Sequence, residues 1–523
     1  MKLSKANLPA LGLITLSILF SVSYTQYPLF SSNQNTYFLP GFACANIGNL
    51  AHDWLANTQD ATPLFSLLVC QTLKWFRWTG IFYLYYGLIQ AIYFIAFYKL
   101  IAYQIKLTSL SHKILAITAI FVLHSAAIRY LLTHSLGPDW AYILEGGLAN
   151  QRMLGSVFQP SVFGVFLLVS VLFALNQRNE LAVLCLALAA SFHPTYLLPS
   201  GLLILSYIFV LWLDKDQRKY PLDKPFIHRI FHLLFLYLLL ILPILLYTLV
   251  HFAFVPPEVA EKAAAILVKV RIPHHADIHT WFNITSLVQL AILISSFFLT
   301  RRPALRAILI VPFLFGSLLT VIQFVTKSNQ LALLFPWRIS IVLIPLALSI
   351  WISWFIEILI PAIPLAKLSV SSYVKPLIPT LSLILISGVV IIGVIRFRLD
   401  LKRYNSAPEI PLYHYVHDHL SAEDVYLIPP KMENFRLSSG AAAYVDFKSS
   451  PYRADEVIEW YRRLSFSNQF YQKPTCNSIR LFEQENITHL VLPKFSSLHC
   501  PFLDQEFEDN FYYLYKLKND FVK

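Results

Sequence analysis

Residues 231–250 read FHLLFLYLLLILPILLYTLV, a run of 20 residues without Asp, Glu, Lys or Arg. A helix needs about 20 apolar residues to cross the hydrocarbon core of a bilayer, so this run predicts a membrane span. Ten further apolar segments accompany it, at about residues 7–25, 80–98, 114–132, 157–175, 181–193, 195–213, 284–300, 307–325, 339–358 and 377–395. The sequence therefore predicts an all-α polytopic membrane domain, residues 1–395, with about eleven transmembrane helices.

The composition of the 523-residue chain supports this fold class. Charged residues make up 13% and hydrophobic residues 57%, whereas soluble proteins carry about 25% charged residues. Residues 1–395 hold 25 Lys and Arg against 12 Asp and Glu, while residues 396–523 hold 16 and 17. The net charge of +12 thus arises in the membrane part, where basic cytoplasmic loops explain it. We therefore expect a lipid bilayer and no nucleic acid as partner.

Residues 396–523 have the charge content of a soluble domain. Helical spacing in RADEVIEWYRRL (453–464) predicts one helix. Runs rich in β-forming residues predict strands at VYLIPP (425–430), AAAYVDF (441–447), ITHLVLP (487–493) and FYYLYKL (511–517). We expect a small C-terminal α/β domain.

Loop charges predict the orientation. If the tight segment 181–213 crosses twice, the later cytoplasmic loops hold ten Lys and Arg and the later outer loops hold five. A single crossing would reverse this excess, which belongs on the cytoplasmic side. The N-terminus is then cytoplasmic and the C-terminal domain extracytoplasmic, although the first segment also has the shape of a signal peptide. The outer loops would be long and would comprise residues 26–79, 133–156, 251–283 and 326–338.

Four of the five cysteines form two pairs in the predicted outer regions. Cys44 and Cys70 share the first outer loop, and Cys476 and Cys500 share the C-terminal domain. Disulfides persist in oxidising compartments, so the pairs are consistent with two disulfides. Free buried thiols are the alternative.

Three outer acids are candidates for chemistry, because a carboxylate at the membrane face can act as general base or metal ligand. Asp53 and Asp60 are the acids of the first outer loop, and Glu145 lies in the second. The alternatives are a solvated loop acid for Asp53, a helix cap for Asp60, which precedes Ala-Thr-Pro, and a helix-terminal charge for Glu145.

Six basic or imidazole side chains are candidates for substrate binding. The third outer loop contains RIPHHADIH, whose Arg and His residues would suit either a phosphate or a divalent cation. An arginine at the start of an apolar run could clamp a lipid-linked anion or serve as an interfacial anchor. The candidates are Arg152, His193, Arg271, His274, His275 and Arg338.

The layout of the chain resembles the GT-C superfamily of polytopic membrane glycosyltransferases. A first span precedes a long outer loop with acids, many spans follow, and an outer α/β domain ends the chain. The segments DWLANTQDATPLF, FQPSVFG, SFHPTYLLP, RIPHHADIHTW and PWRIS also resemble those of an uncharacterised family of bacterial polytopic proteins related to that group. The resemblance implies a bacterial inner (plasma) membrane protein that transfers a sugar from a polyprenyl-phosphate donor at the outer face.

By the same resemblance, Asp53 would be the base or the ligand of a divalent cation, and Arg271, His274, His275 and Arg338 would hold the donor phosphate. The sequence departs from the family at Trp54, where many members carry a second acid, which leaves metal dependence open. Two other functions remain open. They are a transporter or flippase for a lipid-linked saccharide and a non-catalytic assembly subunit.

Overall fold

The computed structural model describes residues 10–214, 226–362, 377–496, 498 and 500–518. In this part of the chain six helices are long and apolar enough to cross a membrane, and a seventh span arises if the pair α6 and α7, bent by 50°, is counted as one. Their bounds are α5 (Ile81–Gln104), α6 (Leu110–Leu123), α7 (Ala126–Leu136), α10 (Leu197–Asp214), α11 (Phe226–Thr248), α16 (Pro303–Thr326), α18 (Ser340–Ala362) and α19 (Leu377–Asn405). The chain is thus a helical protein of the multi-pass membrane type.

The prediction of about eleven spans is not confirmed. Every predicted segment contains a helix, but four of the helices are short: α1 (Ala10–Tyr24), α8 (Val165–Leu175), α9 (Asn179–Phe192) and α15 (Ile284–Leu299). The 14 residues of α9 make a helix about 21 Å long at 1.5 Å per residue, less than the roughly 30 Å of the hydrocarbon core. Apolar composition therefore identified the helices but not their length.

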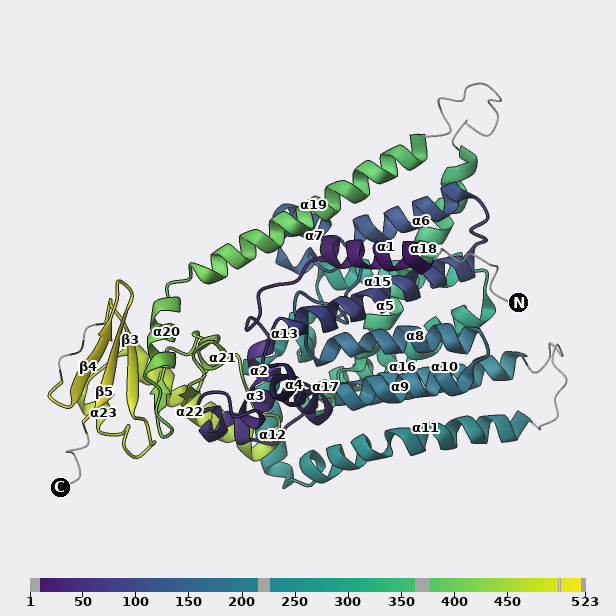
Figure 1. Ribbon diagram of the computed structural model, residues 1–523. Helices are drawn as coiled ribbons and strands as arrows, with labels where there is room; N and C mark the ends of the chain where they lie inside the picture. Colours follow the sequence, from purple (N-terminus) through teal and green to yellow (C-terminus); the bar gives the residue numbers. More distant parts are fainter. Residues whose placement is uncertain (1–9, 215–225, 363–376, 497, 499, 519–523) are drawn as a thin grey trace.

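The long helices run side by side as a bundle, and the sheet lies beyond one end of it (Figure 1). Short helices fill the region between the bundle and the sheet (Figure 1). They include α2 (Gln34–Tyr37), α3 (Leu39–Cys44), α4 (Pro63–Phe76), α12 (Pro257–Ile266), α13 (Pro273–Ala276), α14 (Ile278–Trp281), α17 (Asn329–Leu333), α20 (Ile410–Asp418) and α21 (Phe435–Ser439). The longer helix α22 (Ala454–Gln472) packs against α12, and α23 (Cys476–Ile479) lies at the sheet (Figure 1). These helices come from the predicted outer loops and from the tail.

The tail forms a small mixed sheet, as predicted. Its strand order is β2-β1-β3-β5-β4, with β1 parallel to β2 and β3, and β5 antiparallel to β3 and β4. The bounds are β1 (Val425–Leu427), β2 (Ala442–Ala443), β3 (His489–Pro493), β4 (Leu503–Glu508) and β5 (Tyr512–Leu517). The predicted domain boundary after residue 395 falls inside α19, which runs without a break from the bundle to Asn405.

The C-terminal domain shares a hydrophobic core with the loops of the bundle. Buried side chains of α12, among them Ala263 and Ile266, pack in one cluster with Trp460 of α22, and Trp54 of the first loop packs against it. Gly48 approaches the domain so closely, with φ +57°, that a Cβ atom there would clash with the carbonyl oxygen of Gly440. The domain is therefore docked on the bundle.

The four predicted outer loops meet the C-terminal domain at the same end of the bundle. Asn49 donates from Nδ2 to the carbonyl oxygen of Asp424 at 2.8 Å. Three further hydrogen bonds join the other loops: Arg338 Nη1 to Gln151 Oε1, His275 Nδ1 to the Ala149 carbonyl oxygen, and Arg271 Nη2 to the Lys448 carbonyl oxygen. The four loops thus share one end of the bundle.

The basic residues behind the predicted orientation are only partly described. Six of the ten predicted cytoplasmic charges lie outside the described residues, in 215–225 and 363–376. They are Lys215, Arg218, Lys219, Lys224, Lys367 and Lys375. Both cysteine pairs are joined as disulfides, Cys44 to Cys70 and Cys476 to Cys500.

Candidate functional site

Five of the six predicted binding residues lie in one basic cluster, and the C-terminal domain adds a lysine to it. We define the basic cluster as Arg152, Arg271, His274, His275, Arg338 and Lys448. The ring centroids of His274 and His275 are 4.1 Å apart. The third loop supplies three members because the π-helical turn η7 (Leu267–Arg271), which continues α12, ends at Arg271, and α13 with His274 and His275 begins two residues later.

Mutual repulsion is evident within the basic cluster. Burial lowers the pKa of His274, and the positive charges of Arg271 and Lys448 lower it further. Burial also lowers the pKa of Lys448, again assisted by the charge of Arg271. The acids that oppose these shifts are Asp139, Glu433 and Asp446, and Asp446 is already paired with Arg436. A part-buried surplus of positive charge of this kind suits an anion.

Two guanidinium groups of the cluster have buried donors without a partner in the described residues. They are the Nε atoms of Arg338 and Arg271. Arg338 is only 9% exposed, and its guanidinium carbon lies 5.0 Å from the ring centroid of Tyr196. A buried donor left without an acceptor costs about 1–3 kcal/mol. An anion that accepts from these atoms would recover that free energy.

His193, the sixth predicted binding residue, lies beside the basic cluster. It follows α9 directly, at the bend before Pro194, and its ring centroid is 5.2 Å from that of Tyr196 and 6.1 Å from that of Tyr37. The guanidinium group of Arg338 lies over the ring of Tyr196. The two aromatic rings thus connect His193 with the cluster.

Asp60 faces a small cavity of about 30 Å³ between the first loop and the C-terminal domain. Burial raises the pKa of Asp60, although the hydrogen bond from the Thr62 amide, at 2.8 Å, acts in the opposite direction. The cavity is also lined by Tyr37 and Tyr452, whose hydroxyl groups are 3.2 Å apart. The positive charges of Arg338 and Arg271 reach the Tyr37 hydroxyl, so this tyrosine lies between the cavity and the basic cluster.

Asp53 does not take the catalytic position predicted for it. The side chain is completely buried. Its Oδ2 accepts hydrogen bonds from Arg436 Nε at 2.6 Å and from the amide of Ala443 at 2.9 Å, and its Oδ1 accepts from the amide of Ala56 at 3.0 Å. A carboxylate enclosed in this way holds protein segments together and has no exposed oxygen for a substrate. This placement corrects the assignment of Asp53 as base or metal ligand.

Glu145 lies in a different buried cluster, apart from Asp60. Its Oε1 accepts from Tyr24 at 3.1 Å and lies 3.4 Å from Arg129 Nη1, while its Oε2 is buried without a partner in the described residues. Burial raises the pKa of Glu145 to about 7, against the opposing charge of Arg129. Glu145 therefore serves as a buried, proton-dependent contact rather than as part of the predicted catalytic group.

We expect Glu145 to make the stability of the protein depend on pH. Its folded pKa of about 7 lies above the ordinary value of 4.5, so the folded state holds the proton more tightly than the unfolded state. Stability from this group is full below about pH 4.5 and is lost as the pH rises to about 7. In Glu145→Gln the melting temperature of the purified protein should change less between pH 5 and pH 8 than in the wild type. An unchanged pH dependence would contradict the assignment.

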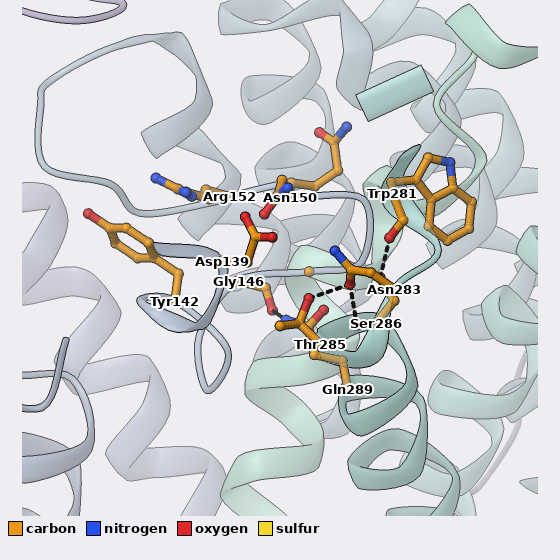
Figure 2. Close-up of a pocket in the computed structure, with 12 residues that line it drawn as sticks. Asp139, Tyr142, Gly146, Asn150, Arg152, Trp281, Asn283, Thr285, Ser286 and Gln289 are labelled. Atoms are coloured by element: carbon orange, nitrogen blue, oxygen red, sulfur yellow. Dashed lines mark hydrogen bonds between the residues drawn. The ribbon is translucent and has the colours of Figure 1, made fainter. Parts of the chain in front are cut away.

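A small polar pocket adjoins the basic cluster; its enclosed volume is about 10 Å³, and the rest of its space is open to solvent. Figure 2 shows Asp139, Tyr142, Asn150 and Arg152 on one side of it and α15 with its N-cap Asn283 on the other. The pocket is lined by amide, hydroxyl and carboxylate groups together with the ring of Trp281. It contains Arg152 of the cluster and Gln151, which accepts from Arg338. Such a lining can hydrogen-bond a polyhydroxyl group beside a bound anion.

The divalent cation that the sequence left open has no matching set of ligands in the part of the chain that the structure describes. The described residues contain no group of three or more His, Cys, Asp or Glu side chains arranged to hold a metal ion. The charges that act on His274 are those of Arg271, Lys448 and Arg152, with Asp139 as the one opposing carboxylate, and those that act on His275 include Arg338 and Arg152. The third loop therefore has the surroundings of an anion site, which was one of the two interpretations of its sequence.

Sequence reasoning did not identify the tail residues of the site. Lys448 enters the basic cluster, and Arg436 pairs with both Asp53 and Asp446 although all three are buried. In the sequence these residues stand among the many charges of an ordinary soluble domain. AAAYVDF (441–447), which was interpreted only as a strand, carries the one local signal, an acid that interrupts an apolar run.

The comparisons with known proteins leave the function open. A family model described as a domain of unknown function, DUF6798, matches residues 407–465. This stretch includes β1, β2 and α21 together with Arg436, Asp446 and Lys448. No curated protein matches the chain. The matched stretch is therefore the part of the C-terminal domain that reaches the basic cluster and Asp53.

Proposed function

We propose that the protein is a membrane glycosyltransferase that uses a polyprenyl-phosphate sugar as donor. The observation that carries the proposal is the part-buried basic cluster, with its unpartnered Nε donors on Arg338 and Arg271, at one end of a bundle of apolar helices. A polyprenyl chain belongs in the bilayer, and its phosphate belongs where such helices end. In the orientation we propose, this end faces the outside of a bacterial inner membrane.

In this proposal the basic cluster binds the donor phosphate. An acceptor hydroxyl attacks the anomeric carbon of the sugar, and the bond from that carbon to the phosphate oxygen breaks. The leaving phosphate keeps the electron pair and gains negative charge. Charge-assisted hydrogen bonds from guanidinium groups are short and strong, and those that strengthen as the charge develops lower the barrier. The adjoining polar pocket would hold the hydroxyl groups of the sugar.

Asp60 is the acid that we propose as general base. It would take the proton that the acceptor hydroxyl loses when the new glycosidic bond forms. Its pKa is raised by burial, which makes the carboxylate a better proton acceptor. Support comes from its place in a cavity that reaches Tyr37, because the charges of Arg338 and Arg271 act on the same tyrosine.

Asp60→Asn should lower sugar transfer by about 10²–10⁴-fold, the usual effect of removing a positioned base. Donor binding should be largely kept, because the substitution leaves the basic cluster intact. The measurement incubates purified protein with polyprenyl-phosphate sugars and membrane acceptors. In the wild type the acidic limb of the pH profile should lie above the ordinary pKa of aspartate, since burial raises that of Asp60.

Glu258→Gln is the matched control for this experiment. Glu258 is an exposed acid on α12 of the third loop, so its loss should leave transfer unchanged. Equal turnover of Asp60→Asn and the wild type would contradict the assignment of Asp60 as the general base. A carrier of lipid-linked saccharides would need no such base. Transport would therefore be favoured if the wild type showed no sugar transfer and Asp60→Asn still moved the lipid-linked saccharide across the membrane.

A further inference from the structure

Residues 446–452 of the C-terminal domain lie against the basic cluster as a strap. Arg271 Nη2 donates to the carbonyl oxygen of Lys448, and Thr36 of the first loop donates to the same oxygen at 3.4 Å. At the end of the strap the hydroxyl of Tyr452 meets that of Tyr37 at 3.2 Å. The strap is thus in contact with the first and third loops at once.

A buried charge network fixes the beginning of the strap. Asp446 is 1% exposed, and its Oδ1 accepts from the amide of Ser449 at 2.6 Å, which closes a turn around Lys448. Its Oδ2 pairs with Arg436 Nη1, and Arg436 Nε pairs with Asp53 of the first loop. The indole nitrogen of Trp460 donates to the Asp446 carbonyl oxygen at 3.0 Å. The network therefore connects the first loop of the bundle to the turn that carries Lys448.

We propose that Lys448 is a phosphate-binding residue of the site and that Asp53, Arg436 and Asp446 are positioning residues that hold it there. The inference rests on the proposed function, and it makes the C-terminal domain a part of the donor site. The class of ligand is the phosphate group of a lipid-linked donor.

Electrostatics supports the placement of Lys448. Bringing an ammonium group next to Arg271 and Arg152 is unfavourable without an anion, and burial together with the charge of Arg271 lowers the pKa of Lys448. Glu433 and Asp446 offset part of this repulsion. An ammonium group offers three rotatable donors and acts as a compact charge, so it can follow the phosphate as its ester bond breaks.

The test measures binding of farnesyl phosphate, a short polyprenyl phosphate, to the full-length protein in detergent. Lys448→Gln should weaken binding by about 10- to 100-fold, the range for a hydrogen bond to a charged group. Lys448→Arg should keep most of the affinity. Lys431→Gln, which removes an exposed lysine of the same domain, should bind like the wild type. Equal affinity of Lys448→Gln and wild type would overturn the inference and leave the proposed function standing.

A second measurement addresses the positioning residues by amine labelling and mass spectrometry. Farnesyl phosphate should protect Lys448 of the wild type from an amine-reactive reagent. In Asp53→Asn the labelling rate of Lys448 should rise and the protection should weaken, whereas Lys431 should label as before. Unchanged labelling of Lys448 in Asp53→Asn would overturn the positioning role. A wild type that neither binds nor is protected would contradict the donor site itself, and with it both proposals.

Discussion

Arg338→Gln should reduce sugar transfer by about 10²–10³-fold, the loss typical of removing one donor that stabilises developing charge. Arg338 combines near-complete burial with an unpartnered Nε, so a phosphate would meet it in a setting with little water. Its other contacts, the bond to Gln151 and the ring of Tyr196, hold the guanidinium group in place. The measurement is the rate of transfer from a polyprenyl-phosphate sugar at saturating acceptor.

Arg338→Lys provides the informative comparison. It keeps the charge but loses the planar fork that binds two phosphate oxygens at once, so its rate should fall between those of Arg338→Gln and the wild type. Arg306→Gln, at the start of α16, controls for the loss of a positive charge elsewhere. Full activity of Arg338→Gln would contradict the role of Arg338 in binding the donor phosphate.

Arg436→Met should lower the free energy of unfolding by about 3–5 kcal/mol, as expected when one partner of a buried ion pair is removed. The substitution leaves Asp53 and Asp446 buried without their common cation. Burying a carboxylate without a partner is strongly unfavourable. The measurement is the melting temperature of the purified protein, together with protease sensitivity of the C-terminal domain.

Arg462→Met is the matched control on the same domain. Arg462 forms exposed ion pairs with Glu459 and Glu485, and such pairs contribute about 0–1 kcal/mol. Combining Arg436→Met with Asp53→Asn and Asp446→Asn should restore part of the stability, because no charge is then left unpaired. A melting temperature of Arg436→Met equal to that of Arg462→Met would contradict a stabilising role of the network.

Apolar runs in the sequence predicted where helices form, because helix formation and hydrophobic burial both follow composition. They did not predict how long each helix is. The predicted segment 157–175 begins with the 3₁₀ turn η4 (Pro160–Gly164), which leaves 11 α-helical residues in α8. The sheet was predicted from its β-branched and aromatic strands, but the edge strand β4 reads LDQEFE. Charged residues are common on exposed edge strands. Because β4 has few apolar residues, the search for runs rich in β-forming residues did not find it.

The candidate site was predictable as far as it is local in sequence. Basic and imidazole residues at loop ends indicated an anion site, and five of the six binding candidates lie in the basic cluster. Pairings between distant segments were not predictable, since no local pattern relates Asp53 to Arg436, 383 positions away. An acid in a loop looks the same in sequence whether it faces a cavity, as Asp60 does, or an arginine from another domain. The catalytic assignment of Asp53 failed for this reason.

The separation between Asp53 and Arg436 also has a consequence for biogenesis. The first loop is synthesised hundreds of residues before its partners, so Asp53, Gly48 and Trp54 remain uncovered until the tail segment from Arg436 to Arg463 has emerged and docked. Contacts of such high sequence separation form late and slowly. A nascent or truncated chain that lacks residues 436–452 therefore has a membrane bundle in which Asp53 is without its partners Arg436 and Ala443. If the protein has the function that we propose, its donor site is complete only after the tail has been translated and has docked.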